Sequence, residues 1–144
     1  MKILFDTSVL VAGIVEAHPM HPRCLNWLQQ AKARDFEFLV VTHSLAETYA
    51  VLTTLPVKPR ISPAVGLRLV HSNIEEAAKI VHLTSADYKA TIKRMADMGL
   101  SGGTVYDALI AAAAQRSSVA RLLTLNPDDF HRVWPEGKGI ISVP

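Results

Sequence analysis

Short apolar runs alternate with longer segments of helical periodicity along this chain. The runs that are typical of buried strands cover residues 2–5, 36–41, 78–83 and 121–124, and residues 139–143 form a candidate fifth. The segments between them are long enough for the helical crossovers that parallel strands require. The pattern therefore predicts an α/β protein with a mainly parallel sheet of four to five strands.

Helical spacing and capping residues predict the helices between these strands. Serine or threonine just before a helix can accept a backbone N–H at its start, and proline ends a helix. The predicted helices are residues 9–16, residues 22–34, a helix from Thr42 or Ser44 to the loop 55–60, a helix from Ser62-Pro63 to about residue 72, a helix from Thr84-Ser85 to about Gly99, and residues 105–116.

The composition is that of one globular domain covering residues 1–144. A hydrophobic fraction of 49% excludes disorder, and a net charge of +2 excludes a strongly basic tail but not a local basic groove. Cys24 is the single cysteine, which excludes an intrachain disulfide and a cysteine zinc cluster. The single cysteine fits a reducing, cytoplasmic setting. Asp6 interrupts the first apolar run, which makes a poor signal peptide, and no apolar run is long enough to predict a membrane helix.

Acidic side chains lie at the ends of several predicted elements. Asp6 follows the first strand, Glu47 and Asp107 lie near the starts of two helices, and the segment 126–129 follows the fourth strand. The carboxyl ends of parallel strands meet at one edge of a sheet, where ligands bind. We therefore expect four distant parts of the chain to gather their acidic residues at that edge.

Each of these acids also has an ordinary explanation. Asp6 could only cap the helix after it, Asp107 could favour its helix dipole, and Glu47 could face solvent. Helical spacing instead predicts that Glu47 and Asp107 point inward, because each shares a stripe with apolar residues. These residues are Ala50 and Val51 for Glu47, and Ile110, Ala111 and Ala114 for Asp107. One shared cation would compensate both charges, and Mg²⁺ or Mn²⁺ would suit oxygen ligands and phosphodiester hydrolysis.

Four stretches of the chain occur in the order that is typical of one known family. These stretches are Phe5-Asp6-Thr7-Ser8-Val9-Leu10, residues 42–47 with Val51-Leu52, residues 106–113, and residues 123–130. The chain thereby resembles the PIN domains, and most closely the VapC-type toxin ribonucleases of toxin–antitoxin pairs. The resemblance implies a three-layer α/β/α sandwich, a Mg²⁺- or Mn²⁺-dependent endoribonuclease acting on RNA, a homodimer and an antitoxin protein as partner.

The resemblance also implies which residues form the site. The expected catalytic residues are Asp6, Glu47, Asp107 and Asp129, and the same four with Asn126 are the expected metal ligands. Thr7, Ser8 and Thr104 are expected to be hydroxyls that orient these carboxylates.

The fourth part of the site, which we call the fourth corner, comes from residues 126–129, and the sequence does not decide which of these residues completes it. Pro127 biases Asn126 towards an extended conformation, and a helix that starts there would make Asn126 its cap. We expect Asp129 to reach back to the Asn126 backbone N–H, as in a capping box, with Asp128 in solvent.

Other polar and aromatic residues suggest weaker contacts. Lys58, Arg60 and His43 are candidates for RNA contact. His18 and His21 lack a third ligand nearby, so a histidine metal site is not expected. Trp27 and Trp134 are candidate anchors of a dimer interface.

Two other functions compete with a ribonuclease. An aspartate after the first strand also begins enzymes that form an aspartyl-phosphate, but Ser8 stands where those enzymes usually carry a second aspartate. A PIN-like domain that has lost its activity is the other alternative. The intact set of Asp6, Glu47 and Asp107 argues against it.

Overall fold

A parallel sheet of five strands forms the centre of the computed structural model, which describes residues 1–144. The strand order is β3-β2-β1-β4-β5, and every pair of neighbours is parallel. The strands are β1 (Lys2–Phe5), β2 (Glu37–Val41), β3 (Lys79–Val81), β4 (Arg121–Leu123) and β5 (Ile141–Ser142). The predicted sheet is confirmed, and the candidate fifth strand belongs to it.

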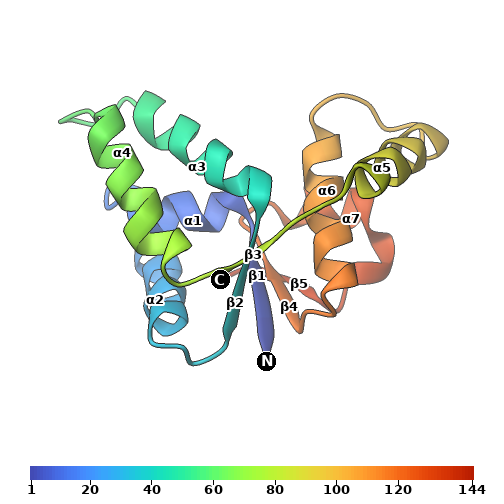
Figure 1. Ribbon diagram of the computed structural model, residues 1–144, viewed down its shortest axis with the longest axis horizontal. Helices are drawn as coiled ribbons and strands as arrows, with labels where there is room; N and C mark the ends of the chain where they lie inside the picture. Colours follow the sequence, from blue (N-terminus) through green and yellow to red (C-terminus); the bar gives the residue numbers. More distant parts are fainter.

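Helices cover both faces of the sheet and give the three layers that the family resemblance implied (Figure 1). One face carries α1 (Thr7–Ile14), α2 (His21–Lys32), α3 (Thr42–Thr54) and α4 (Pro63–Val70), which continues as a π-helical turn, His71–Glu75. The other face carries α5 (Ser85–Asp97), α6 (Thr104–Arg116) and α7 (Pro127–Val133), which a 3-10 turn, Pro135–Gly137, follows.

Successive residues of the strands pack into two separate cores. Ile3 and Phe5 of β1 belong to the core beneath α1 to α4, whereas Leu4 belongs to the core beneath α5 to α7. All three side chains are fully buried. A strand that is covered on both faces has to be apolar at every position, which explains why these strands read as continuous apolar runs.

The helix starts agree with the sequence in two cases and differ in one. The hydroxyls of Ser62 and Thr84 accept backbone N–H groups at the starts of α4 and α5, as predicted. The prediction that Thr42 or Ser44 caps α3 was wrong. The Thr42 hydroxyl donates instead to the Val81 carbonyl at the end of β3 (3.1 Å), and Ser44 is buried within the helix.

Trp134 is a core residue, so the prediction that it anchors an interface was wrong, whereas the same prediction for the partly exposed Trp27 stays a prediction. Trp134 is buried against the sheet beside α7, with 6% of its surface exposed. Trp27 is half-buried, with its ring 5.9 Å from the Phe36 ring and the Arg121 guanidinium 5.8 Å from its centre. None of the helices combines the length and the apolar character that a membrane crossing needs.

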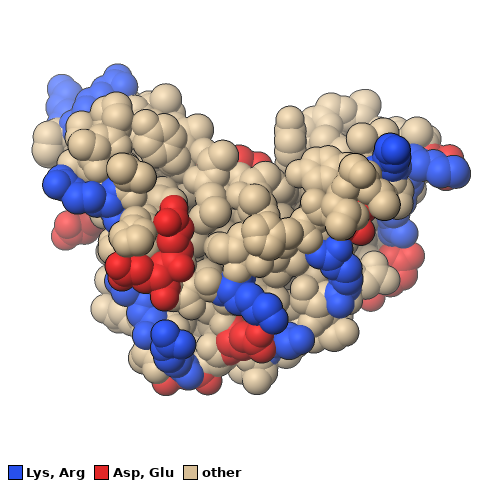
Figure 2. Space-filling view, viewed as in Figure 1, with Lys and Arg blue, Asp and Glu red and all other residues tan.

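The chain changes direction across the sheet between β1 and β4. It moves outward through β2 and β3, and the crossover containing α5 and α6 then returns it to β4, directly beside β1. The helices after β1 and β4 lie on opposite faces of the sheet. We call α1 to α4 one lobe and α5 to α7 the other, and the carboxyl ends of β1 and β4 open into the hollow between these two lobes (Figure 2). Such a switch point is where open α/β sheets bind their ligands.

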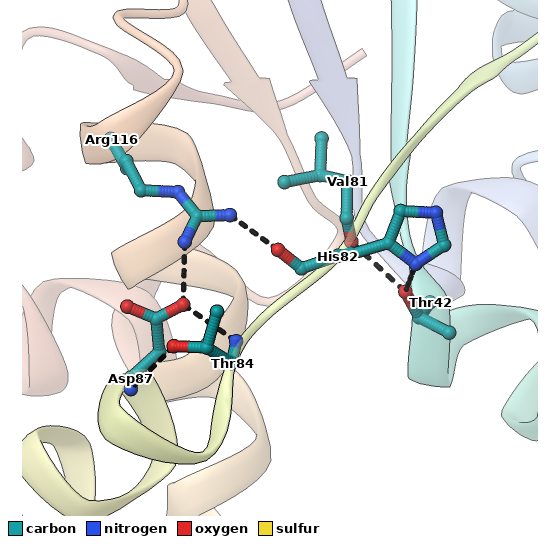
Figure 3. Close-up of polar contacts among 6 residues, drawn as sticks. All are labelled: Thr42, Val81, His82, Thr84, Asp87 and Arg116. Atoms are coloured by element: carbon teal, nitrogen blue, oxygen red, sulfur yellow. Dashed lines mark hydrogen bonds and ion pairs between the residues drawn. The ribbon is translucent and has the colours of Figure 1, made fainter.

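A polar network at the end of β3 ties the two lobes together (Figure 3). Arg116, near the end of α6, donates to the Asp87 carboxylate and to the His82 carbonyl. Thr42, at the start of α3, donates to Val81 in the same segment. The network therefore links α6 to α3, the two helices that carry Asp107 and Glu47.

Candidate active site

Asp6 is the most firmly held residue of the site. It follows β1 directly, and its backbone N–H donates to the Leu123 carbonyl of β4 (2.9 Å). Its side chain is buried, with 5% of the residue exposed, and Oδ2 accepts hydrogen bonds from Ser8 Oγ (2.7 Å) and Thr124 Oγ1 (2.9 Å). Asp6 occupies the N-cap position of α1, but its side chain makes no cap hydrogen bond. Capping alone therefore does not explain this aspartate.

Two hydroxyls connect Asp6 to the loop after β4. Ser8 Oγ accepts from the Leu125 backbone N–H (3.0 Å), and Thr124 Oγ1 accepts from the Asn126 backbone N–H (3.0 Å). The structure thus places Ser8 where the sequence predicted it. Thr124, which is fully buried, was not predicted as a site residue. Its signal in the sequence is a threonine that ends an apolar strand directly before an acidic segment.

Burial dominates the electrostatics of Asp6. It raises the pKa of this carboxyl above its ordinary value, and the hydrogen bonds from Ser8 and Thr124 oppose that rise. Burying an ionised carboxylate costs free energy unless a positive charge or a metal ion compensates it, and the two hydroxyls carry no charge.

Asp107, in the first turn of α6, faces the same place from the opposite lobe. Burial raises its pKa, the negative charges of Asp6, Asp129 and Glu47 raise it further, and Arg132 partly opposes them, with a net value of about 7. The buried stripe of α6 includes Ile110, Ala111 and Ala114, as predicted. Four carboxylates from four segments therefore share one electrostatic neighbourhood.

Glu47 does not point into the core, so that prediction was wrong. The core-facing stripe of α3 is Ser44, Thr48 and Leu52, whereas Ala50 and Val51 are exposed. Glu47 lies beside that stripe at the rim of the cleft, with 41% of its side chain exposed. Its Oε1 atom lies 3.5 Å from Nε2 of His43, one turn earlier.

These residues line a cleft of about 590 Å³ between the lobes, which we call the acidic cleft. Asp6, Glu47 and Asp107 line it together with Thr7, Ser8 and Asn126. The structure thus brings together residues that are more than a hundred positions apart in the sequence, at the sheet edge that the sequence predicted.

The fourth corner has a different geometry from the predicted one. The Asn126 backbone N–H donates to Thr124 Oγ1, so the predicted capping box with Asp129 was wrong. The Asn126 side chain does not cap α7 and lines the acidic cleft instead. Asp129 lies in the first turn of α7, with Oδ1 3.9 Å from Nη2 of Arg132, and Asp128 is exposed, as predicted.

The two other predicted hydroxyls have different partners. Thr7 Oγ1 donates to Ser44 Oγ (3.0 Å) and joins α1 to α3. Thr104 Oγ1 donates to the Ser101 carbonyl (2.9 Å) and closes the turn before α6. Neither hydroxyl is hydrogen-bonded to a carboxylate, so both predicted roles lack support from these contacts.

Of the three candidates for RNA contact, only His43 lies between the two lobes. Lys58 and Arg60 are exposed in the loop after α3, and neither lines the acidic cleft. Lys58 lines a separate hollow with Glu16 near the end of α1. His43 lies between the lobes, with its ring centre 6.0 Å from that of Tyr106 on α6. Burial lowers the pKa of His43, the charges of Glu47 and Asp6 oppose this, and neither ring nitrogen has a hydrogen-bond partner.

The donor atoms of the cleft fit a hard divalent cation. No three acidic, histidine or cysteine side chains already form a closed metal site. Carboxylate oxygens nevertheless line the cleft from three sides, and the half-exposed Glu47 side chain is free to turn towards the others. Burial and the repulsion from neighbouring carboxylates together raise the pKa of Asp107 to about 7, and a cation would remove the repulsion. Asp6, Glu47 and Asp107 would hold it.

Comparisons with known proteins agree with this fold. The sequence profile of the PIN domain matches residues 3–134. Ribonuclease VapC27 of Mycobacterium tuberculosis is 36% identical over 109 residues, which are 76% of this chain and 74% of the relative. Ribonuclease VapC40 of the same organism is 32% identical over 121 residues, which are 83% and 82% of the two chains. The chain belongs to the PIN domain family.

Solved structures share the fold. VapC20 of Mycobacterium tuberculosis, described as a Sarcin-Ricin loop cleaving toxin, superposes with a TM-score of 0.65 at 14% identity, over 83% of this chain and 86% of that one. VapBC2 from Rickettsia felis, bound to a DNA fragment from its promoter, gives a TM-score of 0.65 at 21% identity, over 99% and 98% of the two chains.

Proposed function

We propose that this chain is one PIN-like nuclease domain, residues 1–144, that hydrolyses RNA phosphodiester bonds with Mg²⁺ or Mn²⁺ and acts as the toxin of a toxin–antitoxin pair. The cleft carries the proposal, because Asp6, Glu47 and Asp107 line it from three segments of the chain, and burial together with the charges of Asp6, Asp129 and Glu47 raises the pKa of Asp107 to about 7. The ribonucleases named VapC among its relatives support the substrate class.

Each acidic residue of the cleft has its own role in the proposed reaction. Asp6 uses Oδ2 for Ser8 and Thr124, which holds its carboxylate in place and leaves Oδ1 without a side-chain hydrogen bond. Glu47 and Asp107 bring negative charge from the two lobes and would hold the cation between them and Asp6. When bound, the divalent cation supplies Lewis acidity at a phosphate oxygen and lowers the pKa of a water molecule. Asp129 and Asn126 complete the site from the β4 side.

The test is cleavage of labelled single-stranded or looped RNA by the purified protein. Activity is expected with Mg²⁺ or Mn²⁺ and is expected to vanish in excess EDTA, because the cleft without a cation repels phosphate. Full activity in EDTA would contradict the proposal. A protein that binds RNA but never cleaves it would favour the inactive PIN-like domain instead.

The partners and location follow from the same proposal. We expect an antitoxin protein to inhibit by covering the acidic cleft, and the VapBC2 neighbour supports such a pairing. We also expect a cytoplasmic homodimer. Exposed apolar side chains such as Leu67 on α4 and Ile92 on α5 offer contact surface in place of the buried Trp134. Sedimentation that shows a monomer at micromolar concentration would refute the dimer.

A further inference from the structure

The acidic cleft extends beyond the carboxylates to a part that the proposed reaction does not use. Five apolar residues line this part, which we call the apolar wall: Val11 of α1, Pro19 and Met20 of the loop between α1 and α2, Val51 of α3, and Leu125 after β4. His18 is the one polar side chain among them. An apolar surface with a small number of well-placed polar groups is the usual make-up of a small-ligand site, and the acidic cleft as a whole, at about 590 Å³, is within the usual range for one.

The hydrogen bonds of the loop determine where His18 carries its proton. Nδ1 of His18 accepts from the Met20 backbone N–H (3.0 Å). A backbone N–H can only donate, so Nδ1 of the neutral ring is unprotonated and Nε2 carries the hydrogen. His18 therefore presents an N–H donor, and no protein group accepts from it.

The same loop is fixed in place before any ligand binds. The His21 ring donates from Nδ1 to the Ala12 carbonyl of α1 (2.8 Å), because a carbonyl can only accept. The backbone N–H of His18 donates to the Val15 carbonyl (3.0 Å), and that of His21 donates to the His18 carbonyl (2.9 Å). A donor on such a preorganised loop loses little conformational entropy when it binds a partner.

We propose that the apolar wall receives one unpaired nucleobase of the RNA next to the bond that is cleaved, and that Nε2–H of His18 donates to an acceptor atom of that base. The proposal rests on the proposed function and names its substrate more closely. Every base has an apolar face and an edge with acceptors, which match the wall and the donor. A base that is stacked in a duplex cannot enter, so the preferred substrate is a single strand or a loop with an extruded base.

The position of the wall favours a base over a peptide. The apolar wall and the acidic residues line the same cleft, so a base that is joined to a phosphate held at the acidic residues reaches the wall without leaving the cleft. Three elements, α1, α3 and the loop after β4, contribute residues to both parts. An apolar stretch of the antitoxin is the competing occupant, and the test below separates the two.

The kinetic test compares an RNA with its counterpart that lacks one base beside the cleaved bond. The abasic substrate is expected to lower kcat/KM of the wild type by about 10-fold to 100-fold. His18→Asn keeps an acceptor for the Met20 N–H but loses the donor at Nε2. This variant is therefore expected to cleave the intact RNA more slowly than the wild type does, but faster than the wild type cleaves the abasic RNA, because the base still packs on the wall. It is expected to lose little further activity on the abasic RNA.

Two matched variants control this result. His18→Gln can return an amide N–H near the position of Nε2 and is expected to restore part of the preference. His71→Gln, at an exposed histidine that pairs with Glu75 and Glu76 on the surface, is expected to behave as the wild type. Equal thermal melts show that the variants are folded. Equal losses on both substrates in His18→Asn, or a wild type that ignores the missing base, would overturn the proposal.

A binding measurement separates this proposal from the hydrolytic one. Uncharged nucleosides, added to the metal-free protein, are expected to shift the NMR signals of the Met20 amide and the His18 ring in the wild type but less in His18→Asn. Such shifts without any RNA cleavage would leave the base site standing and refute the hydrolysis. Cleavage without such shifts would overturn the base site alone. A His18→Asn variant with unchanged cleavage but weakened inhibition by the antitoxin would assign the wall to the peptide and also overturn it.

Discussion

Asp6 and Asp107 face each other across the same cleft, and their surroundings differ. Asp6 is buried at the junction of two strands and accepts two side-chain hydrogen bonds, whereas Asp107 lies half-buried at the start of a helix, and burial and charged neighbours rather than hydrogen bonds shift its pKa. The lobe of α1 and α3 thus supplies a fixed carboxylate. The lobe of α6 supplies one whose protonation responds to the occupancy of the cleft.

This difference indicates how an acidic site can exist in a folded protein before it binds a cation. The position of the Asp6 carboxylate is fixed by the uncharged hydroxyls of Ser8 and Thr124, and these hydrogen bonds do not depend on a bound cation. The electrostatic repulsion is concentrated on Asp107, which can take up a proton near neutral pH, because its pKa is about 7. Protonation of one carboxyl in a crowded set is the usual way to relieve like charges.

The sharpest test of the fixed carboxylate is Asp6→Asn. The amide keeps the shape and an acceptor for Ser8 and Thr124 but loses the charge. Cleavage is expected to fall by roughly a thousandfold or more, since about 4 kcal/mol of lost transition-state stabilisation corresponds to that factor. Thermal melts of the metal-free protein are expected to be equal or higher, because like charges are removed.

The control for this substitution is Asp35→Asn, at an exposed aspartate before β2, at the opposite end of that strand from the cleft. It removes one negative charge without touching the site and is expected to leave cleavage unchanged. An active or unfolded Asp6→Asn protein would mean that Asp6 is a structural residue.

The support beneath Asp6 can be tested separately through Thr124→Val. Valine preserves the shape of this fully buried side chain but removes the donor to Asp6 and the acceptor for the Asn126 N–H. Residues that orient metal ligands typically contribute about 10-fold to 100-fold, so cleavage is expected to fall by that factor. The free energy of unfolding is expected to fall by about 1–3 kcal/mol.

Thr124→Ser distinguishes the hydroxyl from packing. Serine keeps both hydrogen bonds and removes one methyl group, so activity is expected to return to near the wild-type level while some stability is lost. The same loss of activity in both variants would mean that packing around Thr124, and not its hydroxyl, holds Asp6.

Most of the fold could be predicted from the sequence, because strands that are buried on both faces leave continuous apolar runs. The edge that gathers Asp6, Glu47 and Asp107 could be predicted as well, since parallel topology brings the carboxyl ends of the strands together. The direction of Glu47 could not. On α3 the core side is lined by Ser44 and Thr48, two polar residues that a hydrophobic stripe does not reveal.

The loop after β4 shows a second limit of the sequence. A capping box joining Asn126 and Asp129 was a sound expectation from local spacing. Thr124, two residues earlier, takes the Asn126 N–H instead, because its hydroxyl is already held in place by Asp6. That bond depends on a residue more than a hundred positions away in the sequence, and local rules carry no information about it.

The responsive carboxylate predicts a pH-dependent effect of Asp107→Asn on the metal-free protein. The pKa of Asp107 rises from an ordinary 3.8 to about 7 on folding, so its protonated form favours the folded state. This contribution is present in full below the ordinary pKa and is lost as the pH rises towards 7. The asparagine variant cannot lose it and is therefore expected to melt several degrees above the wild type at about pH 8, with the difference disappearing at about pH 4.

A divalent cation is expected to reverse this order at about pH 8. The wild type gains stability by binding the ion, and the variant gains less because it has lost a ligand. Calorimetric melts at both pH values, with and without Mg²⁺, measure the effect. Identical melting curves for the two proteins at about pH 8 without metal would show that Asp107 does not experience the charges across the cleft.

The smallest effect is expected at the fourth corner, where single alanine substitutions of Asn126, Asp128 and Asp129 test three neighbouring residues. Asn126 lines the acidic cleft and Asp129 acts on Asp107 through its charge, but Asp129 is also close to Arg132, which partly offsets that charge. Both are therefore expected to act as weak or indirect ligands. Their substitution should raise the Mg²⁺ concentration for half-maximal cleavage by about 3-fold to 10-fold, towards the lower end of the range for residues that support metal ligands. Asp128 is exposed and does not line the cleft, so Asp128→Ala should leave this concentration unchanged. Titrations of Mg²⁺ at saturating RNA decide among the three. A higher requirement in Asp128→Ala alone would mean that α7 turns in the metal-bound protein and that the fourth carboxylate is Asp128.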